Sequence, residues 1–308
     1  MSRAKYHIAL ATANILFGVN FSFYVSLTRA GVAFQQIFFL QLLAAALSFT
    51  PSFATRPYRS MKVEDFGMIF IVALLVIYGW MYMLLWGASY TSPIDASTIS
   101  TLGPVFTLLT ACIVNAERVR WLRFVGIALA LAGAATLLFD KGRSLVESTT
   151  EGYGNALVLC AVVAIAVNTI LIRPQLRRYG VATVMGWYYT IGFIITLPFF
   201  WNELATLDLG RMSAASIAEL LYVMFGGTVL PMYLLYVGAE QLSAVPTALY
   251  RYLQPIVATC LALLRGQSAI DTANIVGAAL IFVGMILVVI APNRSSQSAC
   301  ATRQEPRP

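Results

Sequence analysis

Charged residues are scarce in this sequence. Asp, Glu, Lys and Arg make up only 11% of its 308 residues, whereas 59% of the residues are hydrophobic. Soluble domains carry about 25% charged residues, and an aqueous core could not absorb so much apolar surface. The composition therefore excludes an ordinary soluble domain and predicts an all-α integral membrane protein whose solvent is the lipid bilayer.

Histidine and cysteine are also rare. The only histidine is His7, and the four cysteines form no CxxC pair. This scarcity argues against a metal site, a disulfide framework or a nucleophile–base pair, so we expect no cofactor and no enzymatic activity. The formal net charge of +7 comes without a basic stripe or a reading motif, so no nucleic-acid partner is expected.

Long hydrophobic runs, by contrast, fill most of the chain. A helix that crosses a bilayer needs about 20 mostly apolar residues. Ten runs meet this requirement, at residues 6–27, 32–53, 65–88, 92–115, 119–139, 152–172, 181–201, 214–238, 244–264 and 272–291. The polar residues 293–308 are predicted to form a disordered tail.

One stretch of the sequence occurs twice. Residues 81–139 align without a gap with residues 232–290, at a constant offset of 151 positions, and 14 of the 59 aligned residues are identical. The identities include glycines and prolines, which impose backbone constraints. The repeat predicts two related halves, a first unit at 1–143 and a second unit at 152–292, joined by a linker at 144–151.

Basic residues indicate how the halves are oriented. If both termini are cytoplasmic, 14 Lys and Arg residues fall on the inner loops and tails and five on the outer loops, which agrees with the positive-inside rule. Each half holds five spans, an odd number, so the second half enters the membrane from the opposite side. Ten helices in two five-helix inverted repeats are typical of secondary transporters, which bind substrate near the midplane between the halves and work by alternating access.

Several short motifs resemble those of a known family. The segment Phe17-Gly18-Val19-Asn20-Phe21 is similar to the W-G-x-N-F signature of EamA-type transporters. The repeated stretch resembles their A-x3-S-x-L-x-P-V…E…G…G pattern, in the first copy at Ala96, Ser100, Leu102, Pro104, Val105, Glu117, Gly126 and Gly133, and in the second at Ala248, Leu253, Pro255, Gly277 and Gly284.

This resemblance extends to about residue 292 and implies a member of the drug/metabolite transporter superfamily. Within that superfamily, the sequence is most similar to bacterial inner-membrane aromatic amino acid exporters. The chain departs from the family pattern at three charged positions. Gln41 stands where Arg is common, Gln254 replaces the Glu of Y-L-E-P, and Gln267 with Ser268 replaces a Glu after the ninth span. These losses of charge leave ion coupling through those positions open.

Arg251 is the strongest candidate for a substrate-binding residue. It lies about seven residues into the ninth predicted span, roughly 10 Å along the helix, where a charge costs about 2.5–3.5 kcal/mol. Thr247, Arg251 and Gln254 share one helical face. We interpret Arg251 as a cavity-facing cation that binds a substrate carboxylate through two hydrogen bonds. The alternative is an arginine that snorkels to the inner interface.

The wall opposite Arg251 is predicted to consist of small residues. Ser100 is the residue that aligns with Arg251 in the first copy. It could leave room for a substrate that has one charged and one apolar end, or it could serve helix packing.

Aromatic residues are predicted to line the same pocket. Tyr78, Tyr82 and Trp86 recur every four residues, and Tyr82 aligns with Tyr233 across the repeat. We predict that Tyr78, Tyr82 and Tyr233 line the substrate pocket, where aromatic walls suit flat apolar side chains. An aromatic belt at the membrane interface is the alternative, above all for Trp86.

Two further kinds of residue lie inside the spans. Asn14 and Asn168 are buried amides that need partners, and substrate contact and interhelical hydrogen bonding are both open. Pro104 and Pro255 interrupt the helical hydrogen bonds and are predicted kinks or hinges.

The residues and the resemblance together predict a secondary transporter that exports aromatic and other apolar amino acids. We expect it in the bacterial inner membrane with both termini cytoplasmic, and with an amino acid and the lipid bilayer as its partners. Phosphorylated cargo would need several cations and cationic drugs a buried carboxylate, neither of which the spans offer. Another metabolite or drug in the same fold, or a membrane-embedded enzyme, is the alternative. Transport direction, ion coupling and oligomeric state stay open.

Overall fold

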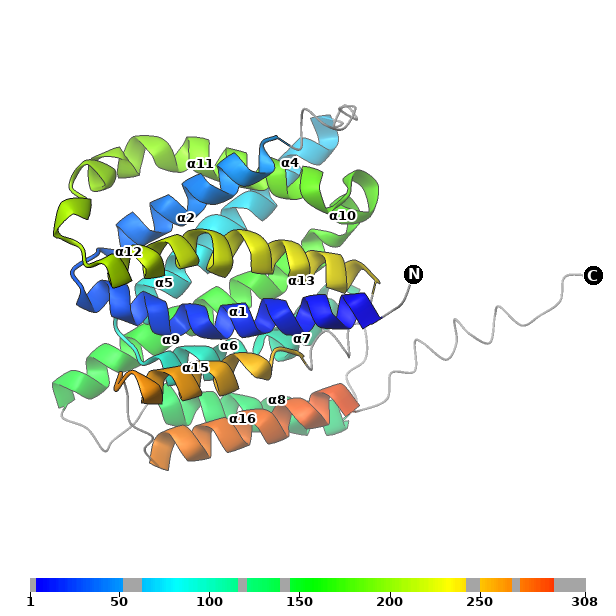
Figure 1. Cartoon of the computed structure of the whole chain (residues 1–308). Helices are drawn as coiled ribbons and strands as arrows, with labels where there is room; N and C mark the ends of the chain where they lie inside the picture. The colour runs from blue at the N-terminus through cyan, green and yellow to red at the C-terminus, as the bar shows by residue number, and fades with distance from the viewer. Residues whose placement is uncertain are drawn as a thin grey trace, which may run out of the picture.

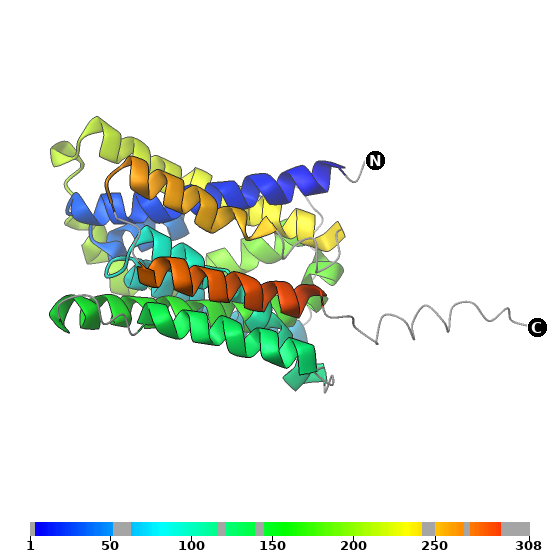
Figure 2. The ribbon, with the colours of Figure 1, turned by 90° about the horizontal axis from the view of Figure 1, so that it is seen from below.

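The protein is a bundle of helices whose axes lie roughly along one line, with neighbouring helices running up or down (Figures 1 and 2). The computed structural model describes residues 4–51, 63–115, 121–138, 145–241, 250–267 and 272–290, and no strand occurs among them. Among these described residues, five helical stretches are long and apolar enough to cross a membrane, namely Ala4–Arg29, Asp65–Ala88, Thr149–Leu171, Val181–Glu203 and Ala214–Gly238. Shorter apolar helices are Phe34–Phe49, Phe124–Thr136, Leu253–Leu264 and Asn274–Gly284.

The first half contains five successive spans. Each predicted run is mostly helical where the structure describes it. Their elements are α1 (Ala4–Arg29), α2 (Phe34–Phe49), α4 (Val63–Leu74), the π-helix η1 (Leu75–Tyr82), α5 (Met83–Ala88), α6 (Pro93–Ser100), α7 (Gly103–Asn115) and α8 (Trp121–Leu138).

The second half repeats this order. A short helix, α10, lies within the predicted inner loop, and Gly180 with a φ of 81° ends it so that α11 can begin at the next residue. The elements are α9 (Leu145–Leu171), α10 (Arg173–Tyr179), α11 (Val181–Ala205), the 3₁₀ turn η2 (Leu209–Arg211), α12 (Ala214–Leu221), the π-helix η3 (Tyr222–Val229), α13 (Leu230–Gln241), α15 (Leu253–Leu264) and α16 (Thr272–Ile290).

Three predicted boundaries differ from the structure. The fourth predicted span is interrupted at Thr101–Leu102, and the ninth at Arg251–Tyr252, whereas each was predicted as one run with a kink or hinge at its proline. Residues 145–151, predicted as linker, belong to α9. They contain no proline or glycine, so nothing in them stops a helix.

Helices of each half pack against helices of the other half. Second spans pack against each other as α2 on α11, and fifth spans as α8 on α16. The first span of each half instead packs on the third and fourth spans of the other half. Thus α1 contacts α13 and α15, while α9 contacts α5 and α7. Each of these contacts between the halves therefore has a counterpart in which the halves change roles.

Glycines show that the paired fifth spans run in opposite directions. In the α8–α16 contact, Gly133 lies against Gly277, and Gly284 lies against Gly126. These four residues are two pairs of repeat mates, because 126 and 277, like 133 and 284, differ by the 151-residue offset. Equivalent helices that cross antiparallel in this reciprocal way are related by a pseudo-two-fold axis in the membrane plane. The structure thus has the predicted inverted-repeat architecture.

Candidate functional site

Two interrupted helices meet in the middle of the bundle. The breaks at Thr101–Leu102 and at Arg251–Tyr252 lie just before Pro104 and Pro255. Proline has no N–H for the carbonyl four residues earlier, and it disfavours a helical conformation at the preceding residue. At the breaks, backbone hydrogen bonds reach back three residues instead of four. The Val105 N–H donates to the Leu102 carbonyl at 2.9 Å, and the Gln254 N–H donates to the Arg251 carbonyl at 3.1 Å. Both prolines therefore lie at breaks, as the sequence predicted for kinks.

A cavity of about 70 Å³ lies between these breaks and the first, third, sixth and eighth spans. One part of its wall carries polar groups, from Asn20, Tyr24, Ser100, Thr169, Tyr236, Arg251 and Gln254. The other part is apolar and consists of Phe17, Phe21, Trp80, Leu84, Val162, Ile165, Met232 and Leu235. The cavity therefore offers both polar and apolar contacts to one ligand.

Arg251 extends across the cavity to the opposite helix break. A Cβ atom on Gly103 would lie 2.8 Å from its Nη1 atom, so the absence of a side chain at residue 103 makes room for the guanidinium. Tyr236 lies beside it. Within the described part of the chain, the ion pairs are Arg178 with Asp65 and Arg265 with Glu219, so Arg251 has no carboxylate partner there.

Gln254 is held in place by a hydrogen bond to Asn14, on the side away from the cavity. Its Nε2 atom donates a 2.7 Å hydrogen bond to Oδ1 of Asn14, and Asn14 Nδ2 donates to the Leu10 carbonyl at 2.7 Å. Gln254 is 6% exposed and Asn14 fully buried. Asn14 thus supports the cavity wall through Gln254 and does not itself line it.

A second polar chain joins the cavity to the π-helix η3. The Tyr24 hydroxyl accepts hydrogen bonds from Asn20 at 2.6 Å and from Gln41 at 2.8 Å. Gln41 also donates to Thr228 at 2.5 Å, and Asn20 donates to the Gly227 carbonyl at 3.0 Å. Single-turn π segments are common at functional sites, and here the amides bond to carbonyl and hydroxyl groups of such a segment.

The structure brings together only part of the predicted site. Ser100, Arg251 and Gln254 line the cavity, and Asn168 is buried beside Tyr236. Thr247 lies outside the described residues.

The predicted tyrosines lie elsewhere. The Tyr82 ring packs on Phe38 and Phe200, with centroids 5.1 and 5.9 Å away. The Tyr78 hydroxyl lies 2.8 Å from Thr196 Oγ1, and Tyr233 is 41% exposed on the outside of the bundle. Tyr78 and Tyr82 do not line the cavity, because the third span turns Trp80 and Leu84 toward it, and Tyr233 does not line it because α13 turns Met232, Leu235 and Tyr236 toward it.

Sequence reasoning missed Tyr24, Trp80 and Tyr236 as members of the site. Gly103, the repeat mate of Gln254, belongs to the wall of small residues predicted opposite Arg251. Trp80 and Tyr236 carried no usable signal, because helices in a membrane are apolar on every face and periodicity does not mark the inner one.

A transmembrane bundle with an amphipathic cavity at two helix breaks, between inverted halves, defines the class of secondary transporters. The sequence pattern of the EamA-like transporter family matches residues 4–139 and 152–290. The chain therefore belongs to the EamA-like transporter family, and it is a multi-pass membrane protein.

Named relatives agree with this class. The chain is 26% identical over 274 residues to a protein of Streptantibioticus cattleyicolor named "Probable terminal-alkyne amino-acid exporter", with 86% of each chain covered. It is 22% identical to a WAT1-related protein of Arabidopsis thaliana, covering 98% of this chain and 90% of that protein. A crystal structure that shares 16% sequence identity superposes with a TM-score of 0.62 and covers 93% of this chain and 98% of that one, which shows the same fold.

Proposed function

We propose that this transporter exports amino acids with apolar side chains and that Arg251 binds their carboxylate. The observation that carries this proposal is the Arg251 guanidinium, which extends into the cavity toward Gly103 without a carboxylate partner in the described chain. A cation inside the membrane is costly unless water or an anion compensates it. A substrate carboxylate supplies such an anion and accepts two parallel hydrogen bonds.

The remaining cavity wall suits the rest of an amino acid. Ser100 and Tyr236 offer hydroxyl oxygens that can accept from an α-ammonium group. Trp80, Phe17 and Leu84 form an apolar surface for the side chain. The S. cattleyicolor relative, named as an amino-acid exporter, supports the same class of cargo.

The small volume of the cavity indicates that this is a closed conformation of the transporter. Its volume of about 70 Å³ is about half of the 150 Å³ of an apolar protein cavity that binds benzene. An aromatic side chain therefore fits only after the walls separate, as alternating access requires. We propose that the structure is a closed form and that aromatic amino acids bind to a wider one, in the bacterial inner membrane with both termini cytoplasmic.

The test is amino acid flux in proteoliposomes at matched protein level. Loss of a charge-assisted pair of hydrogen bonds removes about 1.5–3 kcal/mol, so Arg251→Ala should weaken the apparent affinity roughly 10- to 150-fold. Arg251→Lys should restore it only in part, because an ammonium lacks the planar fork. Arg177→Ala, at an exposed arginine of α10, is the matched control. Unchanged affinity in Arg251→Ala would place the carboxylate site elsewhere.

A further inference from the structure

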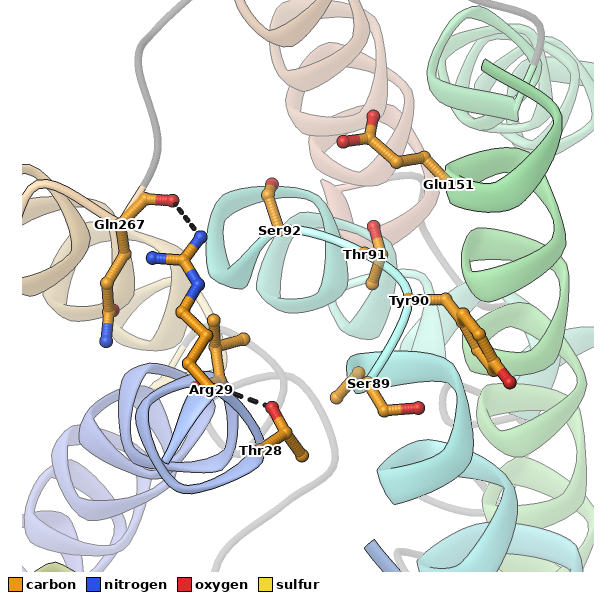
Figure 3. A pocket seen from close by; sticks show the side chains of 10 residues that line it. Thr28, Arg29, Ser89, Tyr90, Thr91, Ser92, Glu151 and Gln267 are labelled. Atoms are coloured by element: carbon orange, nitrogen blue, oxygen red, sulfur yellow. Dashed lines mark hydrogen bonds between the residues drawn. The ribbon is translucent and has the colours of Figure 1, made fainter. Parts of the chain in front are cut away.

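A second pocket of about 290 Å³ opens at the end of the bundle opposite the first residues of α1 (Figure 3). It lies where α1 ends at Arg29, where α5 is followed by the turn at residues 89–92, and where α9 carries Glu151. Its walls are mostly polar, unlike those of the central cavity. We propose that this outer pocket is a second binding site for the transported amino acid, with Arg29 holding the carboxylate and Glu151 the ammonium group. The proposal rests on the proposed amino acid cargo.

The two charges enter the pocket from opposite sides, with Ser92 and Thr91 between them (Figure 3). A free amino acid carries one negative and one positive group on the same carbon. A pocket that presents a guanidinium and a carboxylate on facing walls therefore matches both charges at once. A ligand with only one of these charges can use only one wall.

The guanidinium of Arg29 is fixed in direction. Its Nη2 atom donates a 2.8 Å hydrogen bond to the main-chain carbonyl of Gln267. Gln267 is itself held, because its Nε2 atom donates to the Ser22 carbonyl at 2.9 Å and its Oε1 accepts from the Ser22 hydroxyl at 2.5 Å. A guanidinium has five N–H donors, and the bond to Gln267 uses one of them. The anchor thus orients the group and leaves donors for a ligand.

The outer pocket continues the faces that line the central cavity. On α1, Phe21 lines the cavity and Val25 and Thr28, one and two turns further on, line the outer pocket. On α5, Leu84 lines the cavity and Ala88 the outer pocket. Both helices therefore carry one continuous surface from the first compartment to the second, which is the arrangement of a route for a substrate.

Among the described residues, the two compartments have no lining residue in common. A Cβ atom on Gly87 would lie 2.7 Å from the Gly154 carbonyl oxygen, and one on Gly154 would lie 2.8 Å from the Gly87 oxygen. The backbones of α5 and α9 are thus in direct contact at this level, and the fully buried Val158 packs beside them. A substrate in the outer pocket would be a separate bound species and not an extension of the central one.

The test is protection of a cysteine from a charged thiol reagent in nanodiscs. Ser89→Cys in a cysteine-free variant places the thiol on the pocket wall. L-Phenylalanine and L-leucine should slow its labelling severalfold, whereas phenethylamine, which lacks the carboxylate, and 3-phenylpropionate, which lacks the ammonium, should not. Arg29→Gln and Glu151→Gln should each weaken protection roughly tenfold or more in ligand concentration, which is about 1.4 kcal/mol. Arg265→Gln, at an arginine paired with Glu219, is the control and should leave protection intact.

The Arg251→Ala background separates this site from the central one. Protection at residue 89 should persist in Arg251→Ala, whose flux is impaired if the central assignment is correct. The outer site is refuted if no amino acid slows labelling, if 3-phenylpropionate protects as well as L-phenylalanine, or if protection follows Arg251 and ignores Arg29. The proposed function fails separately, through flux that is indifferent to Arg251→Ala.

Discussion

Gly133 of α8 lies against the main-chain oxygen of Gly277 in α16, so closely that a Cβ atom on residue 133 would stand 2.7 Å from it. Their repeat mates, Gly284 and Gly126, form the same contact with the helices exchanged. Helices in lipid associate through such close packing of small residues, because no hydrophobic effect drives them together. The contact therefore depends on the absence of side chains at these positions.

We expect Gly133→Ala to lower the stability of the protein. The added methyl group overlaps backbone atoms, which cannot turn aside, and overpacking of this kind costs about 1–3 kcal/mol. The measurement is the midpoint of thermal unfolding in detergent. Gly67→Ala in α4 is the control, since nothing lies within 4 Å of a Cβ atom there. Equal midpoints for the two variants would contradict the α8–α16 contact.

Gly103→Ala should affect substrate binding more than stability. The atom nearest to the new methyl group is Nη1 of Arg251, 2.8 Å away at the end of a flexible side chain. The guanidinium must move, and we expect roughly tenfold weaker apparent affinity, about 1.4 kcal/mol, with little change in unfolding temperature. In an Arg251→Ala background the same substitution should have no further effect on affinity. Additive losses in the double variant would show that residue 103 acts independently of Arg251.

Gln254→Glu should make transport depend on pH. The new carboxylate would lie on the cavity wall three residues from Arg251 and compete for it with the substrate. At pH values above the pKa of this carboxyl group, the group is charged and apparent affinity should fall. As the pH drops through that pKa, which is about 4.3 for a free glutamate, protonation should release Arg251 and restore affinity. Gln254→Leu cannot titrate and serves as the control in flux measured over a pH series. A flat profile for the glutamate variant would mean that the two side chains do not interact.

Single cysteines should report the orientation of the chain. In a cysteine-free variant, a thiol at Ser213, the exposed N-cap of α12, should react with an impermeant reagent added to intact cells. A thiol at Arg177, exposed in α10, should react only after the membrane is opened. The expectation follows from the excess of Lys and Arg on the loops on the side of α10. The reverse pattern would invert the topology and turn the outer pocket toward the cytoplasm.

The two-half architecture could be predicted from the sequence because the internal repeat pairs equivalent positions of the two halves. An offset of 151 residues pairs Ser100 with Arg251 and Pro104 with Pro255, and the structure places Ser100 and Arg251 on the same cavity. Glycine and proline impose backbone constraints that can be read without knowing which face of a helix is inside. That is why the inverted halves and the positions of the two interruptions follow from the sequence.

The walls of the cavity were less predictable. Tyr78 and Tyr82 were assigned to it from a spacing of four residues, which assumes a regular α-helix. The aromatic stripe does exist, since the Tyr78 and Tyr82 ring centroids lie 6.4 Å apart and those of Tyr82 and Trp86 6.0 Å apart. It packs on Phe38 of α2 and Phe200 of α11, however, and Trp80 lines the cavity instead. Spacing shows that residues share a face of a helix but not which neighbour that face meets. Tyr233 was assigned by symmetry with Tyr82 and was misplaced with it.

The packing of first-half helices on second-half helices has a consequence for biosynthesis. When α1 has left the ribosome and entered the membrane, its packing partners α13 and α15 lie more than 200 residues ahead and have not been made. Helix α5 also precedes its close neighbour α9, which belongs to the second half and is made later. The first half must therefore wait in the bilayer with its contact surfaces covered by lipid. The bundle can close only when the last helices are inserted, so quality control of this protein has to tolerate a half-finished chain for most of its synthesis.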